Sequence, residues 1–167
     1  MLQTALLVIF PALMAYAAAS DLLTMRIPNK LSLALLVAFA ALALASSLSW
    51  TDVLMHAAAG TLILGVCFAM FAFGWIGGGD AKLAAAISLW FGFEILMEYL
   101  LTAAIAGGAL TLAIVFFRGT PLPGFALKWA WLSRLHDRKS GVPYGIALAV
   151  AALLVYPHTP IWHAVIS

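Results

Sequence analysis

Six apolar segments follow one another along the chain, and short polar or basic stretches separate them. The segments that we expect to span a membrane are 2–20, 31–49, 53–75, 81–94, 97–117 and 142–157. A helix rises about 1.5 Å per residue and about 20 apolar residues cross a bilayer, so most of these segments are long enough. Lipid offers no partner to an open backbone polar group, and no alternation of apolar and polar residues argues for a barrel. The pattern therefore predicts an all-α polytopic membrane protein with about six transmembrane helices.

The overall composition supports a membrane protein. Hydrophobic residues make up 66% of the 167 positions and charged residues only 8%, whereas a soluble domain is about half apolar and about a quarter charged. So few charges cannot cover the surface of a soluble fold of this size. We therefore interpret residues 1–167 as one membrane-embedded domain. A net charge of +2 is too small to indicate nucleic acid as a partner.

Cysteine and metal chemistry are not expected. Cys67 is the single cysteine, so the chain has neither an intrachain disulfide nor a cysteine pair for zinc. His56 lies four residues after Asp52, and the two could pair on one helix face. No third ligand follows at a useful spacing. We expect the protein to need neither a metal nor another cofactor.

The positions of the basic residues decide between one long helix and two over residues 81–117. All eight Lys and Arg residues fall in three stretches: Arg26 and Lys30; Lys82; and Arg118, Lys128, Arg134, Arg138 and Lys139. If two helices meet at a break near Glu94 and Glu98, the three stretches share one side of the membrane. One helix would move five basic residues to the other side. Because cytoplasmic loops carry the excess of Lys and Arg, the pattern favours two helices, with both termini outside the cytoplasm.

The long basic loop, residues 122–139, has an amphipathic pattern. Phe125, Trp129, Leu132 and Leu135 recur at helical spacing among basic side chains. A helix of this kind is expected to lie on the inner membrane surface and to bind anionic lipid. A direct role of the loop in docking a substrate is the alternative.

Two carboxylates lie where predicted spans meet the cytoplasmic face. Asp21 follows the first span, and Asp80 precedes the fourth. Two carboxyl groups that meet there can share one proton, because like charges that close do not both ionise easily. One can then activate water as a general base, while the protonated partner polarises a scissile carbonyl. The alternative is that both are ordinary helix-end acids, with Asp80 as an N-cap.

Three motifs surround these acids. Residues 77–83, Gly-Gly-Gly-Asp-Ala-Lys-Leu, contain a Gly-x-Gly-Asp sequence. Asp21 is followed, after five residues, by Ile27-Pro28-Asn29. Residues 138–145, Arg-Lys-Ser-Gly-Val-Pro-Tyr-Gly, form a basic stretch that leads into the last span. In this order, at three consecutive predicted cytoplasmic edges, the motifs resemble those of the type IV prepilin peptidases, which are intramembrane aspartyl proteases.

The resemblance implies a catalytic pair, a substrate and a location. Asp21 and Asp80 would be the catalytic residues. The residues expected to shape the site are Gly77, Gly78, Gly79, Lys82, Pro28, Asn29, Pro143, Tyr144 and Gly145. The implied activity is removal of a basic leader from prepilins or pseudopilins, after a glycine, at the cytoplasmic face of the bacterial inner membrane. Lys82 could tune the charge of Asp80 or only follow the topology rule, and Tyr144 could line the site or anchor the interface.

One feature departs from the long form of that family. Bifunctional members carry an N-terminal domain with paired cysteines and also methylate the new N-terminus, whereas this chain starts directly in a predicted helix and has one cysteine. It resembles the short branch that serves tight-adherence, or Flp-type, pili. We therefore expect no N-methyltransferase activity. Presenilin-like proteases place Tyr before the partner aspartate, whereas Ser20 precedes Asp21 here.

A non-enzymatic membrane protein is the competing interpretation. A small transporter, channel subunit or assembly factor could use Asp21 and Asp80 as an ion or proton relay. That class predicts inverted repeats and a polar path through the membrane midplane. The sequence has neither a clear similarity between its halves nor acids in the middle of predicted helices. The choice of prepilin, the aspartate that holds the shared proton and the oligomeric state are left open by the sequence.

Overall fold

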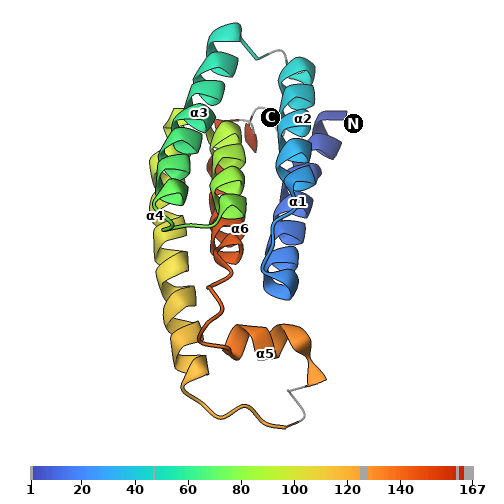
Figure 1. Cartoon of the computed structure of the whole chain (residues 1–167). Coiled ribbons are helices and arrows are strands. Elements are labelled where there is room, and N and C mark those ends of the chain that lie inside the picture. The colour runs from blue at the N-terminus through green and yellow to red at the C-terminus, as the bar shows by residue number, and fades with distance from the viewer. Residues whose placement is uncertain (1, 47, 125–127, 161, 164–167) are drawn as a thin grey trace.

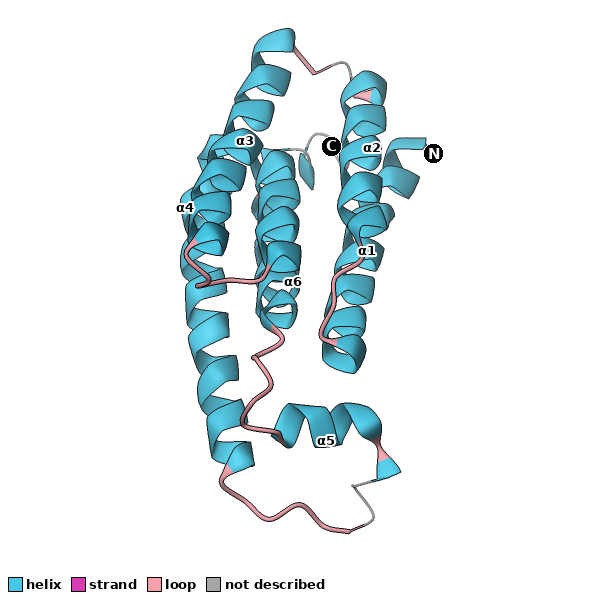
Figure 2. Cartoon of the chain, in the orientation of Figure 1, coloured by secondary structure: helices cyan, strands magenta, loops and turns pink. Residues whose placement is uncertain are grey.

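Helices account for nearly all the regular structure of the protein. The computed structural model describes residues 2–46, 48–124, 128–160 and 162–163 and, within them, side chains from residue 8 onward. The helices are α1 (Leu2–Thr24), α2 (Asn29–Ala45), α3 (Trp50–Ala72), α4 (Gly78–Arg118), α5 (Ala130–His136), α6 (Tyr144–Val155) and a short 3-10 helix, η2 (Tyr156–His158). No strand occurs in these ranges (Figure 2). The all-α prediction is therefore confirmed for this part of the chain.

The range assigned to α4 contains two helices that meet at Gly92. Its backbone angles, φ 61° and ψ −174°, are not helical, and they are accessible almost only to glycine. Residues 78–91 run in one direction and residues 93–118 return beside them (Figure 1). The prediction of two helices is confirmed, but the break lies at Gly92 instead of near Glu94 and Glu98.

The two ends of the bundle differ in content. The start of α1, the reversal within α4 and the C-terminal segment with η2 lie at one end, and α5 lies at the other (Figure 1). We call the first the far end and the second the α5 end. Between them, α4 contacts α2, α3 and α6, while α1 contacts α2 and α6. The fold therefore brings the end of α1 and the starts of α2, α4 and α6 toward the α5 end.

An aromatic cluster holds the half of the bundle nearest the far end. Trp90, Phe10 and Tyr156 are buried, and the Phe10 ring lies 4.8 Å from the Trp90 ring and 4.4 Å from the Tyr156 ring. The Trp90 indole N–H donates to the Leu35 carbonyl at 3.0 Å. Removing a buried aromatic side chain of this size costs about 3–5 kcal/mol. The cluster thus fixes α1, α2, α4 and η2 against one another, away from the two aspartates.

The outer surface of the bundle is apolar. By length and composition α3 and α4 are long enough to cross a membrane, and shorter apolar helices cover Val8–Thr24, Asn29–Ala45 and Tyr144–His158. Leu44 is 82% exposed and Phe116 is 78% exposed. Side chains of this kind are stable on an outer surface when lipid is the solvent. These features are those of a membrane protein.

The basic loop contains less helix than its pattern predicts. The helix α5 covers seven residues, Ala130–His136, within the predicted 122–139. Trp129 is its N-cap, with extended backbone angles. Residues 125–127, with the predicted anchor Phe125, lie outside the described residues. The expectation of a helix over the whole loop is therefore wrong for its described part.

Candidate active site

Asp21 lies buried in the last turns of α1 and is held by the first turn of α6. Its side chain is 5% exposed, and its Oδ2 accepts the backbone N–H of Gly145 at 2.8 Å. The first N–H groups of a helix have no partner within that helix and favour negative charge. A Cβ on Gly145 would lie only 2.8 Å from Asp21 Oδ2 and 2.7 Å from the Ile27 side chain. Glycine at this position is thus what lets α6 approach the carboxylate.

Asp80 is the third residue of α4 and turns back toward the start of its own helix. Gly77 is the N-cap, and its backbone N–H donates to the Asp80 carboxylate. This contact is the side-chain half of a capping box, in which an acid at the third position satisfies the N-cap N–H. The alternative that Asp80 is itself the N-cap is therefore wrong. Its side chain stays half-buried.

The segments that carry the two carboxyl groups converge on Ile27, and Asp21 is a charged neighbour of Asp80. Ile27, in the turn between α1 and α2, lies against Gly79 and against Gly145: a Cβ on Gly79 would be 3.2 Å from the Ile27 Cβ. Three segments that are far apart in sequence thus converge because two glycines leave room for one isoleucine. Sequence reasoning used Ile27 only as part of a motif and missed this contact.

The turn before α2 is built to hold that isoleucine in place. Met25 has φ 54°. The Ser20 and Thr24 hydroxyls both donate to the backbone carbonyl oxygen of Arg26, at 2.9 Å and 3.2 Å. Pro28, the N-cap of α2, has an extended backbone conformation (φ −64°, ψ 137°). The motif around Pro28 therefore positions the turn.

Lys82 joins α4 to α2 beside Asp80. Its ammonium group donates to the Asn29 side-chain oxygen at 2.9 Å. The sequence left open whether Lys82 tunes Asp80 or only follows the topology rule. The structure gives it a third role, because it pairs with another residue that the motifs single out. This bond fixes the spacing of two helices next to the aspartates.

Tyr144 and the remaining motif glycines pack the surrounding backbone closely. Tyr144 opens α6 directly after the buried Pro143 and lies across Gly107, where an added Cβ would overlap its ring and hydroxyl. A Cβ on Gly78 would lie 3.3 Å from the Phe71 ring. Gly107 is missed by sequence reasoning, because its partner lies 37 positions away and neither residue signals the contact.

Two arginines fold the basic loop back onto this end of the bundle. The Arg118 guanidinium donates to the carbonyls of Leu135, Ser140 and Gly141 at 2.8, 3.0 and 2.8 Å. Arg134 donates to the Leu23 carbonyl, at the end of α1, at 2.9 Å. The sequence predicts for these residues a role in topology and lipid binding, with substrate docking by the loop as the alternative. Their backbone contacts show that they also hold α5 and the approach to α6.

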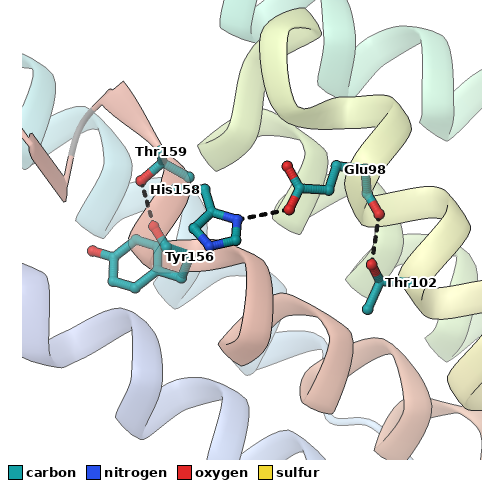
Figure 3. A network of polar contacts seen from close by, with 5 residues as sticks. All are labelled: Glu98, Thr102, Tyr156, His158 and Thr159. Carbon is teal, nitrogen blue, oxygen red and sulfur yellow. Dashed lines mark hydrogen bonds and ion pairs between the residues drawn. The ribbon is translucent and has the colours of Figure 1, made fainter.

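The polar residues at the far end belong to separate contacts. His56 Nδ1 donates to the Leu89 carbonyl at 2.8 Å, since a carbonyl can only accept. Asp52 accepts the Ser49 hydroxyl at 2.7 Å, and the described contacts do not include the pairing of Asp52 with His56 that the sequence allows. In Figure 3, Glu98 of α4 faces His158 of η2, and their side chains approach to 2.6 Å.

Within the described ranges, no three His, Cys, Asp or Glu side chains gather in a way that could hold a metal ion. The carboxyl groups that the motifs bring to the α5 end are those of Asp21 and Asp80. One carboxyl is buried with a backbone donor, and the other is half-exposed and caps its own helix. Such a pair can share a proton and act as general base and general acid on a bound water and a carbonyl.

Comparison with known proteins relates the chain to one family. A family model described as the type IV leader peptidase family matches residues 8–112, which include both aspartates. The prepilin leader peptidase/N-methyltransferase of Bacillus subtilis (strain 168) is 37% identical over 121 residues, covering 70% of this chain and 48% of that protein. The chain thus spans about half the length of this relative. No solved structure matches.

Proposed function

The chain belongs to the type IV leader peptidase family, and we propose that it is an aspartic endopeptidase that removes basic leaders from prepilins or pseudopilins. The observation that carries the proposal is the convergence on Ile27 of the segments that hold Asp21 and Asp80, which makes the two acids neighbours. Each carboxyl is oriented by a backbone N–H at a helix start. Paired carboxyls in fixed positions are what acid–base hydrolysis of a peptide bond requires.

The proposed reaction is attack by water on the carbonyl of a Gly–X bond. The ionised carboxyl removes a proton from water, and the resulting hydroxide adds to the carbonyl carbon while the protonated carboxyl donates to the carbonyl oxygen. Collapse of the tetrahedral gem-diol intermediate breaks the C–N bond: the leaving amine takes a proton from the protonated carboxyl, and the ionised carboxyl takes a proton from one hydroxyl of the intermediate, which restores the pair. The products are the leader with a C-terminal glycine and the apolar segment with a new N-terminus.

We place the six apolar helices, with α4 counted as two, across the bacterial inner membrane with the aspartates at the cytoplasmic face. The basic side chains Arg26, Lys30 and Lys82 all lie next to the convergence of α1, α2 and α4, where the positive-inside rule expects them. Trp129 and Trp131 stack with ring centroids 6.4 Å apart beside α5. Aromatic side chains among basic residues favour a position at the membrane surface, in contact with anionic lipid.

We also propose that the residues of this chain perform no N-methyl transfer. The relative whose name includes that activity is about twice as long as the part matched here. Cys67, the one cysteine, lies in α3, so these residues contain no cysteine pair of the kind found in bifunctional members. Incubation with cleaved substrate and S-adenosylmethionine carrying a labelled methyl group should leave the substrate unlabelled. Incorporated label would overturn this part of the proposal.

Leader cleavage in membranes tests the peptidase activity. The wild type, Asp21→Asn and Asp80→Asn would each be co-expressed with a prepilin-type protein, and cleavage followed by gel and N-terminal sequencing. Cleavage after glycine by the wild type, with a loss of about 10²-fold or more in both variants, is expected. Glu98→Gln is the matched control, because Glu98 pairs with His158 at the far end. Normal cleavage by either Asn variant would exclude the carboxyl-pair mechanism.

A further inference from the structure

A groove runs between α2, α3 and the first half of α4. Its volume is about 490 Å³. Most of its lining is apolar, and Leu33, Leu36 and Leu64 in its walls are 60%, 47% and 45% exposed. The polar side chains of Asn29, Thr61 and Lys82 also line it.

One end of the groove lies at the start of α2 and the first turns of α4, and neither aspartate is among its lining residues. Asn29 and Lys82, which bond to each other, line that end, and Lys82 follows Asp80 by two positions. From Lys82 to Leu89 the lining extends seven residues along α4, which corresponds to about 10 Å of helix. The groove thus starts at residues that border the candidate site and continues along α4 toward the break at Gly92.

Small residues of α3 and α4 form the surface of the groove where these two helices meet. A Cβ on Gly60 would lie 3.1 Å from the Leu89 Cβ and 3.2 Å from the Ala85 carbonyl oxygen, so α3 and α4 approach closely at this point. Ala57 and Ala86 extend the same surface. Small residues in membrane helices let another helix come near the backbone and gain van der Waals contact. The shape therefore suits a helix better than a compact polar ligand.

We propose that this groove binds the apolar helix of the substrate, over about its first two turns after the scissile bond. The inference rests on the proposed peptidase function, which puts the scissile bond at Asp21 and Asp80 and the apolar segment directly after it. That segment must leave the aspartates toward the membrane interior, and the groove begins at Asn29 and Lys82, extends in that direction along α4 and is apolar. A second cavity, of about 440 Å³, lies at the far end and is lined by Asp52, His56 and Glu94. Its position and polarity do not fit an apolar helix that starts at the aspartates.

Cysteine cross-linking tests where the substrate helix lies. Because Cys67 is the single cysteine, Cys67→Ala gives a background into which Thr61→Cys, in the groove, or Thr102→Cys, outside it, can be introduced. Asp80→Asn keeps the substrate uncleaved. The probe is a reporter with a basic leader, a glycine and an apolar segment that carries one cysteine at successive positions. Disulfide formation is expected with Thr61→Cys and not with Thr102→Cys.

Kinetics with bulky substitutions give an independent measurement. The hydroxyls of Thr61 and Thr102 make the same bond, 2.8 Å to the carbonyl four residues earlier, so Thr61→Phe and Thr102→Phe are a matched pair. Thr61→Phe should raise KM for the reporter about tenfold with kcat little changed, and Thr102→Phe should leave both unchanged. The inference is overturned if the wild type and Thr61→Phe cleave the reporter equally well and Thr61→Cys forms no cross-link with it. In that case the groove holds lipid, and the peptidase function still stands. If the wild type cleaves no prepilin-type protein, the proposed function itself fails.

Discussion

The position of Gly145 against Asp21 decides how precisely the carboxyl can be placed. The backbone N–H of this residue donates to Asp21 Oδ2, and the space where a Cβ would stand is already taken by that oxygen and by Ile27. Even a methyl group must displace either the carboxylate or the isoleucine that lies between the two motifs. The space at position 145 is therefore too small for any side chain larger than the hydrogen of glycine.

Gly145→Ala should reduce leader cleavage by about 10²-fold, because displacement of a catalytic group by about 1 Å is enough for a loss of that size. The variant should still fold, since the aromatic cluster lies at the other end of the bundle. Gly141→Ala is the control, because nothing lies within 4 Å of a Cβ there. Initial rates in membranes, normalised to the amount of folded protein, measure the effect; equal rates for the two variants would contradict it.

At the scale of elements, the reversal inside α4 places residues 78–91 against α3 and sends residues 93–118 back toward the α5 end. The His56 imidazole supports this break in two ways. It donates to the Leu89 carbonyl, which lies in the last turn before the break, and a Cβ on Gly92 would lie 3.1 Å from its ring. The last carbonyls of a helix lack internal partners, so a side-chain donor there is stabilising.

Gly92→Ala should lower the free energy of unfolding by about 1–3 kcal/mol, because the backbone angles at this position are strained for any residue with a Cβ. Denaturant or thermal unfolding in detergent measures the loss. Gly65→Ala in α3 provides the comparison, since nothing lies within 4 Å of a Cβ at that glycine. Equal stability of the two variants would mean that residues 91–93 relax without cost.

Two adjacent glycines give a sharp test of the packing between α4 and α6. Gly107→Ala would drive a methyl group into Tyr144, whereas Gly108→Ala points into open space. Overpacking of this kind costs about 1–3 kcal/mol, while alanine in a helix is favoured over glycine by about 1 kcal/mol. Gly107→Ala should therefore unfold earlier than the wild type and Gly108→Ala should not. The same stability for both would show that Tyr144 moves aside freely.

The sequence predicts the helices of this fold better than the points where they meet. Long apolar segments and the distribution of Lys and Arg lead to six helices and to a reversal between the fourth and fifth. They do not place the break at Gly92, because a glycine between two phenylalanines occurs within continuous helices as well. Likewise the spacing of Trp129, Leu132 and Leu135 predicts a longer helix than α5. Helical spacing carries no information on the hydrogen bonds of Arg118 and Arg134 that hold the loop.

In the candidate site, too, the sequence predicts the residues better than the contacts between them. Resemblance to a family singles out Asp21, Asp80 and Gly145, and the structure brings their segments together. Ile27 as the residue between them, and Gly107 as the partner of Tyr144, depend on contacts between distant segments. Periodicity and motif spacing carry information along one element only, so such contacts become visible when the chain is folded.

At the scale of the whole molecule, Arg118 links the end of α4 to the loop that leads into α6. Arg118→Met would remove donors to three carbonyls, so the loop should become more sensitive to chymotrypsin near Trp129 and Trp131, and cleavage of substrate should fall. Arg118→Lys should restore little, because one ammonium group cannot reproduce the planar fork of a guanidinium. Arg138→Met, which replaces an exposed side chain, is the control. Full protection of the loop in Arg118→Met would contradict the role.

The orientation in the membrane is the property on which the whole proposal depends, because a basic leader presented in the cytoplasm can be cut only by aspartates on that side. Thr51, near the start of α3, and Thr120, after α4, are both exposed and lie at opposite ends of the bundle. In the Cys67→Ala background, an impermeant maleimide added to spheroplasts should label Thr51→Cys. It should label Thr120→Cys only after the membrane is opened, because the basic residues near Thr120 keep that end inside. The reverse pattern would place Asp21 and Asp80 outside the cytoplasm, where no prepilin leader could reach them, and the chemistry of the pair would need another substrate.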